Sequence, residues 1–170
     1  MKKNENKISN RYIVFALLLI MSISWMSVIS GFSSKNAEES TVQSNRVTEF
    51  LIMLFEDDSE SLTEEEKQAL IEKYDGIVRT AAHFSVFAVL GILTYFTAGS
   101  LCWIPDFAVR PSCISFPFCV LFSAADEFHQ MFVPGRSFQF KDIATDSVGA
   151  LCGVLTGVLA VIIIRRKNNK

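Results

Sequence analysis

Long apolar runs alternate with polar segments along this chain, and four of the runs are long enough to cross a membrane as helices. A bilayer core requires about 20 predominantly apolar residues in helical form. Runs of this kind cover residues 12–29, 77–98, 113–132 and 143–164. We therefore predict an all-α fold, a four-helix transmembrane bundle with a short extracytoplasmic helical segment between the first two spans.

The first apolar run, residues 12–29, has two interpretations. It follows a basic head at residues 1–11 and precedes the small residue Ser30, as a cleaved signal peptide would. Its apolar run is long for a signal peptide, however, and the small-residue cleavage site is poor. We favour a retained membrane anchor, and the signal peptide is the alternative.

Residues 30–76 form a polar, acidic segment between the first two predicted spans. Twelve acidic and four basic residues lie between positions 35 and 75. The segment also contains apolar residues at helical spacing, which predict an amphipathic helix. These residues are Val47, Phe50, Leu51, Leu54 and Phe55.

Capping signals divide this acidic segment further. Ser61–Glu64 and Thr63–Glu66 are overlapping capping boxes, a pattern typical of a helix N-terminus. They predict a second short helix on the outer surface of the membrane or over the end of the bundle. Residues 36–43 are interpreted as a polar linker.

Basic residues at the two ends of the chain predict its orientation. Lys and Arg near the ends of membrane spans favour the cytoplasm. The head at residues 1–11 is basic, and the tail at 165–170 begins with Arg165 and Arg166. Because an even number of spans places both ends on one side, we predict a multi-pass protein of the cell membrane with both termini cytoplasmic. Arg136 and Lys141 weakly favour the opposite orientation.

Composition agrees with a membrane protein and argues against a nucleic-acid partner. Half of the 170 residues are hydrophobic, 15 are Phe, and the mean hydropathy is +0.32. The net charge is −2, and no basic patch with interleaved aromatic residues is present. The four cysteines form no C-x-x-C pattern and no zinc-finger spacing, so we expect small buried hydrophobic residues.

Ionisable and amide side chains gather at one predicted depth of the bundle, near the outer ends of the last three spans. Charges inside a bilayer are costly, and they usually mark a substrate path, a proton relay or a structural ion-pair network. The residues are Arg79 and His83 on the second span, Asp126, Glu127 and Gln130 on the third, Arg136 in the following turn, and Asp142 and Asp146 on the fourth.

A glycine pattern on the last span indicates how these groups could meet. Gly149, Gly153 and Gly157 form G-x-x-x-G-x-x-x-G, a strip that allows two helix backbones to approach closely. Asp146 continues the same face by one turn. The face that packs inward is therefore predicted to carry a carboxylate at its outer end.

Arginines, carboxylates and one histidine at the same depth suggest an anion-binding site with acid–base groups. Arg79 and Arg136 are predicted to bind phosphate or carboxylate, because guanidinium groups bind both in bidentate fashion. Clustered carboxylates cannot all ionise freely, so one of them is suited to acid–base catalysis. Glu127 is the favoured catalytic residue, with Asp126 and His83 as further candidates. Gln130, Asp142 and Asp146 complete the predicted binding site.

The sequence predicts no metal centre and names no cofactor. His83 and the neighbouring acids offer ligand atoms for a divalent cation, but no helical H-x-x-x-H or H-E-x-x-H pattern supports zinc. No nucleophile motif, P-loop or dinucleotide-binding loop is visible.

The block DEFHQMFVPGR, followed by KDIATDSVGALCG, resembles the VanZ-like family of membrane proteins, as does VRTAAHF in the second span. The resemblance extends over about residues 77–157, within a three-span core at 77–164, and the family often has Asn in place of Asp146. It implies a membrane location and a link to the cell envelope or to resistance to the lipoglycopeptide teicoplanin. The matching positions are His83, Asp126, Glu127, Gln130, Arg136, Asp142, Asp146 and Gly149.

Three functions remain open from the sequence. The first is an outer-facing pocket that binds, or also modifies, an anionic lipid-linked head group such as that of a cell-wall precursor, or a lipoglycopeptide at the membrane. The second is a non-catalytic transporter, for which four spans are few unless the chain forms a homo-oligomer. The third is a structural partner of envelope enzymes, in which the charged cluster only fixes helix packing. In each case the surrounding partners are membrane lipids.

Overall fold

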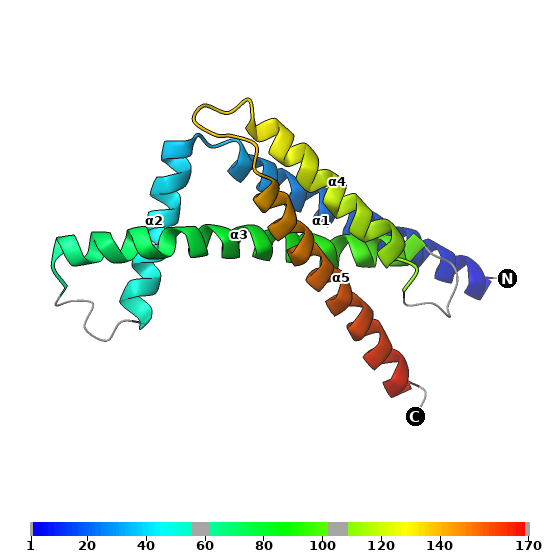
Figure 1. Ribbon diagram of the computed structural model, residues 1–170. Helices are drawn as coiled ribbons and strands as arrows, with labels where there is room; N and C mark the ends of the chain where they lie inside the picture. The colour runs from blue at the N-terminus through cyan, green and yellow to red at the C-terminus, as the bar shows by residue number, and fades with distance from the viewer. Residues whose placement is uncertain (1, 56–61, 102–108, 169–170) are drawn as a thin grey trace.

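The computed structural model describes residues 2–55, 62–101 and 109–168, and the regular structure in these ranges is entirely helical (Figure 1). This confirms the all-α prediction. Three of the helices, α1, α3 and α5, are long and apolar enough to cross a membrane. The helices are α1 (Lys2–Ser33), α2 (Ala37–Phe55), α3 (Glu64–Leu101), α4 (Ser112–Gln130) and α5 (Phe140–Asn168).

The third predicted span, α4, is not among the helices that qualify as membrane spans, because it is not apolar enough. It is 19 residues long, and its last turns hold Asp126, Glu127, His129 and Gln130, which lower the hydropathy of the whole helix. The predicted count of four spans is therefore not confirmed by this criterion.

Helix α3 is longer than the predicted second span. It runs without a break for 38 residues from Glu64, so the predicted short helix and the span are one element. The Thr63–Glu66 capping box is confirmed: the Thr63 N–H donates to Glu66 Oε2 at 2.9 Å, and the Glu66 N–H donates to Thr63 Oγ1 at 3.3 Å. Ser61, of the other predicted box, lies outside the described residues. The first half of α3 extends beyond the rest of the bundle (Figure 1).

Helix α2 crosses this extended part of α3 (Figure 1). The predicted linker at 36–43 is wrong, because α2 already begins at Ala37. Asn36 caps it: the Glu39 N–H donates to Asn36 Oδ1 at 2.8 Å. On the α3 side of α2, Ser44 and Thr48 are buried, and the Ser44 hydroxyl donates to the Asp75 carboxylate. The residues of the predicted apolar stripe lie on α2 and are exposed.

Helices α3 and α5 form the most extensive contact of the bundle. A Cβ atom added at Gly149 would overlap the backbone carbonyl of Phe84, and one at Gly153 would overlap that of Ala88. The predicted glycine strip therefore does bring two helix backbones together. Asp146 lies one turn earlier on the same buried face.

Helix α1 packs against α3 through polar as well as apolar contacts. The Trp25 Nε1–H donates to the Val86 carbonyl at 2.9 Å, and the Ser22 and Thr97 hydroxyls are 3.1 Å apart. Ile29 enters the apolar core of the bundle. The segment interpreted as an anchor is thus an integral part of this fold.

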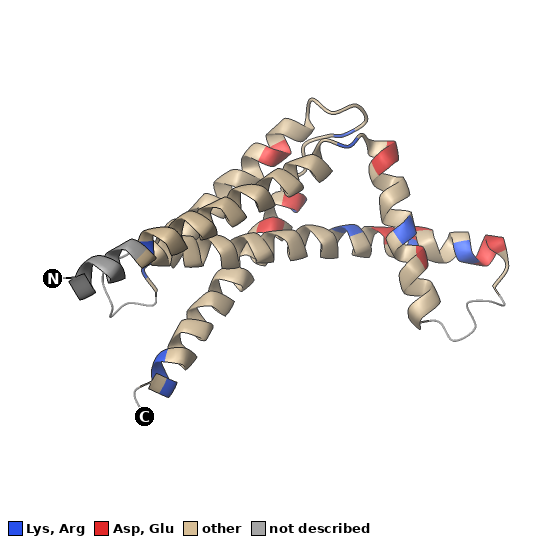
Figure 2. Cartoon of the chain, turned by 180° about the vertical axis from the view of Figure 1, so that it is seen from behind, with Lys and Arg blue, Asp and Glu red and all other residues tan. Residues whose placement is uncertain are grey.

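The outer surface of the bundle is apolar. Many large hydrophobic side chains of α1 and α5 are exposed. Charged residues gather toward the helix ends, on α2 and on the first half of α3 (Figure 2). Such large apolar surfaces are typical of contact with lipid. Cys119 is buried as predicted, whereas Cys113 and Cys152 are exposed on this surface, so the prediction was wrong for these two. Cys102 lies outside the described residues.

Candidate functional site

A cavity of about 550 Å³ lies where the end of α1, helix α2, the middle of α3 and the end of α4 meet. Its volume is in the range of small-molecule sites. Apolar side chains, among them Phe32, Val47, Leu51, Ile77 and Val78, form much of its wall. Five predicted site residues also line it: Arg79, His83, Asp126, Gln130 and Arg136.

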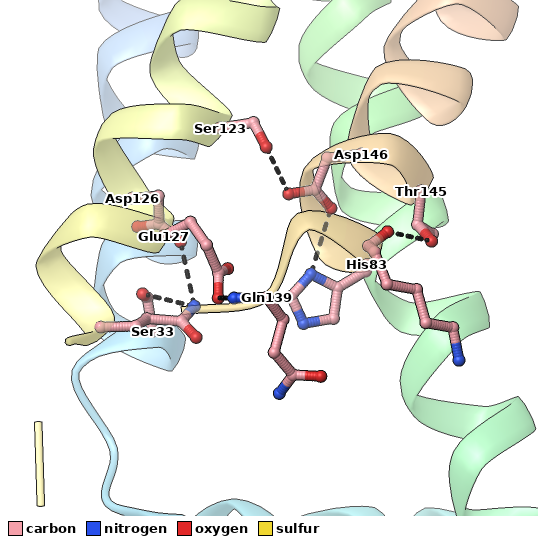
Figure 3. Close-up of polar contacts among 10 residues, drawn as sticks. Ser33, His83, Ser123, Asp126, Glu127, Gln139, Thr145 and Asp146 are labelled. Carbon is pink, nitrogen blue, oxygen red and sulfur yellow. Dashed lines mark hydrogen bonds and ion pairs between the residues drawn. The ribbon is translucent and has the colours of Figure 1, made fainter. Parts of the chain in front are cut away.

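Asp146 lies at the centre of a three-residue network between α3, α4 and α5 (Figure 3). Its Oδ1 is 3.1 Å from His83 Nδ1, and its Oδ2 accepts a hydrogen bond from the Ser123 hydroxyl at 2.7 Å. Asp146 is only 2% exposed. Each carboxylate oxygen thus has a hydrogen-bond partner, and of the two partners only His83 lines the cavity.

Asp126 and Gln130 form a second network that reaches α1. Gln130 Nε2 donates to Ser33 Oγ at 2.9 Å and to Asp126 Oδ2 at 3.4 Å. The shared face predicted from their spacing is correct, since both residues are buried. This network joins the end of α4 to the end of α1 beside the cavity.

Glu127 faces a different environment from its neighbour Asp126. It is 1% exposed, and its Oε1 accepts a hydrogen bond from the backbone N–H of Gln139 at 3.0 Å (Figure 3). Glu127 is not among the cavity-lining residues. The observed contact anchors the loop between α4 and α5.

That loop, residues 131–139, carries Arg136 toward the cavity. Gly135 adopts a left-handed backbone with φ of 76°, which glycine tolerates without steric cost. The Ala37 N–H donates to the Pro134 carbonyl at 3.3 Å, so the start of α2 also holds the loop. The predicted turn position of Arg136 is therefore correct.

Arg79 and Arg136 line the cavity and are each half-buried. Within residues 2–55, 62–101 and 109–168, neither forms an ion pair within 4.0 Å with a carboxylate. Burial lowers the pKa of Arg136 and the nearby charge of Arg79 lowers it further, while the carboxylates of Glu127, Asp142 and Asp126 partly offset both effects.

Comparison with known proteins agrees with this geometry. A sequence model of the family described as VanZ/LLP1 matches residues 17–163. The chain belongs to the VanZ/LLP1 family. The match includes the cavity and every predicted site residue, and it extends beyond the resemblance seen at 77–157. No curated protein and no solved structure matches the chain.

Membership of the VanZ/LLP1 family, together with the long apolar helices, is consistent with a membrane protein linked to antibiotic resistance. Asp142, on the first turn of α5, is half-buried and does not line the cavity. His129 is exposed on α4. In the described part of this VanZ/LLP1 protein, no three His, Cys, Asp or Glu side chains converge as metal ligands would.

Sequence reasoning missed three contributors to the site of this VanZ/LLP1 protein. Ser123 is three residues before Asp126 and shares its helical face, so its spacing could have revealed it. Ser33 and the backbone N–H of Gln139 reach the site from other elements. Only the folded arrangement reveals those two contacts.

Proposed function

We propose that this protein is a multi-pass membrane protein whose outward-facing cavity binds the anionic head group of a membrane lipid. The observation that carries the proposal is the pair Arg79 and Arg136, which face a largely apolar cavity and form no ion pair within 4.0 Å with a carboxylate of the described residues. In this arrangement the two guanidinium groups hold the head group, and apolar side chains hold the start of the lipid chain.

The chemistry of the cavity wall favours an amphiphile over other ligands. A small soluble anion would leave the apolar wall formed by Val47, Leu51 and Ile77 without a role. A neutral lipid would leave two half-buried guanidinium groups unpaired, which is costly. A lipid carrying phosphate satisfies both parts of the wall, because guanidinium groups bind phosphate oxygens in bidentate fashion.

The proposal fits the family relationship. Lipid-linked cell-wall precursors are anionic amphiphiles, and they belong to the cell envelope on which lipoglycopeptide antibiotics act. A cavity of about 550 Å³ accommodates a head group and part of one chain rather than a whole lipoglycopeptide. We therefore favour the lipid-linked head group over the antibiotic as the direct ligand.

We place α4 in the membrane as a fourth span. Its 19 residues extend about 28 Å, close to the thickness of a bilayer core. At one end of the bundle Arg11 donates to the Ser100 carbonyl, and a Cβ atom at the neighbouring Gly99 would contact Pro111, which directly precedes α4. At the other end Ala37 contacts Pro134, just after α4. Helix α4 thus extends between the same two ends of the bundle as α1.

Four spans place both termini on one side, and the basic ends of the chain favour the cytoplasm. The cavity then opens on the outer side. In a variant without native cysteines, Ser137→Cys should react with a membrane-impermeant maleimide added to intact cells, whereas Val109→Cys should be protected until the cells are opened. The reverse labelling pattern would invert the orientation.

The binding proposal predicts a specific effect of the two arginines. Farnesyl diphosphate, a lipid with an anionic head, should bind the purified protein in lipid nanodiscs, as measured by calorimetry. Arg79→Gln and Arg136→Gln should each weaken binding about tenfold or more, because each removes a charged hydrogen-bond donor. Inorganic diphosphate should bind less tightly than farnesyl diphosphate, since it cannot use the apolar wall.

Arg46→Gln is the matched control, because Arg46 is exposed on α2 and does not line the cavity. It removes the same charge from the outer part of the protein. Equal weakening by Arg46→Gln would reduce the effect to general electrostatics, and a wild-type protein that does not bind farnesyl diphosphate would refute the proposal.

A further inference from the structure

We infer that His83 is a catalytic base and that the site hydrolyses the diphosphate of its bound lipid, releasing inorganic phosphate. This inference rests on the proposed function, because the arginines must hold the head group before any reaction. It adds a reaction to a binding site, and it assigns different roles to His83, Asp146 and Ser123.

The orientation of His83 is the first support. Its Nδ1 lies 3.1 Å from the Asp146 carboxylate, which can only accept a hydrogen bond when ionised, so the ring proton belongs on Nδ1. The Nε2 atom then carries the lone pair. It has no hydrogen-bond partner among the described residues, and His83 lines the cavity.

The rigidity of Asp146 is the second support. It is 2% exposed, and the Ser123 hydroxyl donates to its other oxygen at 2.7 Å. The carboxylate is therefore fixed from both sides and can stabilise the imidazolium that forms when His83 accepts a proton. Asp146 is a positioning residue, because it does not line the cavity itself.

The hydrogen-bond partner of Ser123 indicates which group is the nucleophile. In a serine hydrolase the histidine contacts the serine hydroxyl and accepts its proton. Here Ser123 donates to Asp146 and makes no hydrogen bond to His83 (Figure 3). Ser123 therefore holds the aspartate in place, and water is the nucleophile that His83 activates.

The arginines place the phosphate near the base. Arg79 precedes His83 by four residues on α3, so the two side chains share one face of the helix. Arg136 reaches the same cavity from the 131–139 loop. A diphosphate bound to both guanidinium groups lies beside the imidazole, and the two positive charges offset the negative charge of the transition state.

The reaction is balanced with water as the only co-reactant. The water oxygen forms a bond to the terminal phosphorus while one of its protons moves to His83 Nε2. The bridging P–O bond breaks, and its electron pair remains on the lipid monophosphate. The proton then passes from His83 to solvent or to the released phosphate, which restores the neutral imidazole.

His83→Asn tests the base directly. The asparagine amide can still donate to Asp146 from about the position of Nδ1, but it has no atom equivalent to Nε2. Release of inorganic phosphate from farnesyl diphosphate in nanodiscs should fall by about 100-fold or more, the usual contribution of a general base. Binding measured by calorimetry should change by less than about threefold, because binding rests on the arginines.

Asp146→Asn tests the positioning role. Asparagine can still accept from His83 and donate to Ser123, so the fold and the KM are expected to persist. The kcat should fall about tenfold or more, because the imidazolium loses its counter-charge. If Asp146 only stabilised the fold, the kcat of the Asp146→Asn protein would equal that of the wild type. That result would overturn the positioning role.

The outcomes separate the two proposals. If wild-type protein binds farnesyl diphosphate but releases no phosphate above the rate of the His83→Asn protein prepared in the same way, the catalytic inference is wrong and the binding function stands. If wild-type protein does not bind, both are wrong. Phosphate release that depends on His83 and on both arginines supports both.

Discussion

Gly153→Ala is expected to lower the free energy of unfolding by about 1–3 kcal/mol, and Gly153→Leu to prevent assembly of the folded bundle. The added Cβ would overlap the Ala88 backbone carbonyl of α3, which cannot turn aside as a flexible side chain could. Separation of α3 from α5 would also break the contact between His83 and Asp146. Thermal unfolding in detergent and the yield of monodisperse protein measure both effects.

Gly76→Ala is the matched control. Gly76 lies inside α3, and a Cβ atom there would meet nothing within 4 Å. Alanine should therefore stabilise the protein by up to about 1 kcal/mol through helix propensity alone. A Gly153→Ala protein as stable as wild type would show that the close approach of the two helices is not needed.

Glu127→Leu is expected to destabilise the protein by about 1–3 kcal/mol, because it removes the partly buried hydrogen bond between the Gln139 N–H and a carboxylate. The 131–139 loop would lose an anchor, and with it the position of Arg136. Affinity for farnesyl diphosphate should therefore fall as well. Thermal unfolding and calorimetry measure the two consequences.

Glu127→Gln separates anchoring from catalysis. The glutamine side-chain oxygen can still accept from the Gln139 N–H, so stability, binding and phosphate release should remain near the wild-type values. Loss of phosphate release alone, with binding and stability intact, would restore the acid–base role that the sequence suggested for Glu127.

The depth of the ionisable residues could be predicted because helical rise and span direction are local properties of the sequence. Arg79, His83, Asp126 and Arg136 were assigned to one level, and they line one cavity. The glycine strip likewise predicted a close helix contact, since small residues every four positions share one face.

The sequence alone could not show which carboxylate faces the cavity. Asp126 and Glu127 are adjacent, so their side chains point about 100° apart around α4, toward different neighbours. One faces Gln130 and the cavity, and the other faces the backbone of the 131–139 loop. Which neighbour each meets depends on how α1 and α5 pack, and that arrangement leaves no local pattern.

The limits of α2 and α3 were missed for two different reasons. Asn36 and Glu39 form a capping pair that was present in the sequence but was hidden among polar residues interpreted as a linker. Helix α3 continues without a break past Asp75, whose carboxylate accepts a hydrogen bond from the Ser44 hydroxyl of α2, a contact that the sequence did not reveal. Composition changes from acidic to apolar along α3, but the helical backbone does not change with it.

A structure of the protein in nanodiscs containing farnesyl diphosphate would test the central claim most directly. We predict continuous elongated density in the cavity, with a compact head between Arg79 and Arg136 beside His83 and a tail along Val47 and Ile77. A cavity closed by its own side chains, or arginines paired with carboxylates of the same chain, would contradict it.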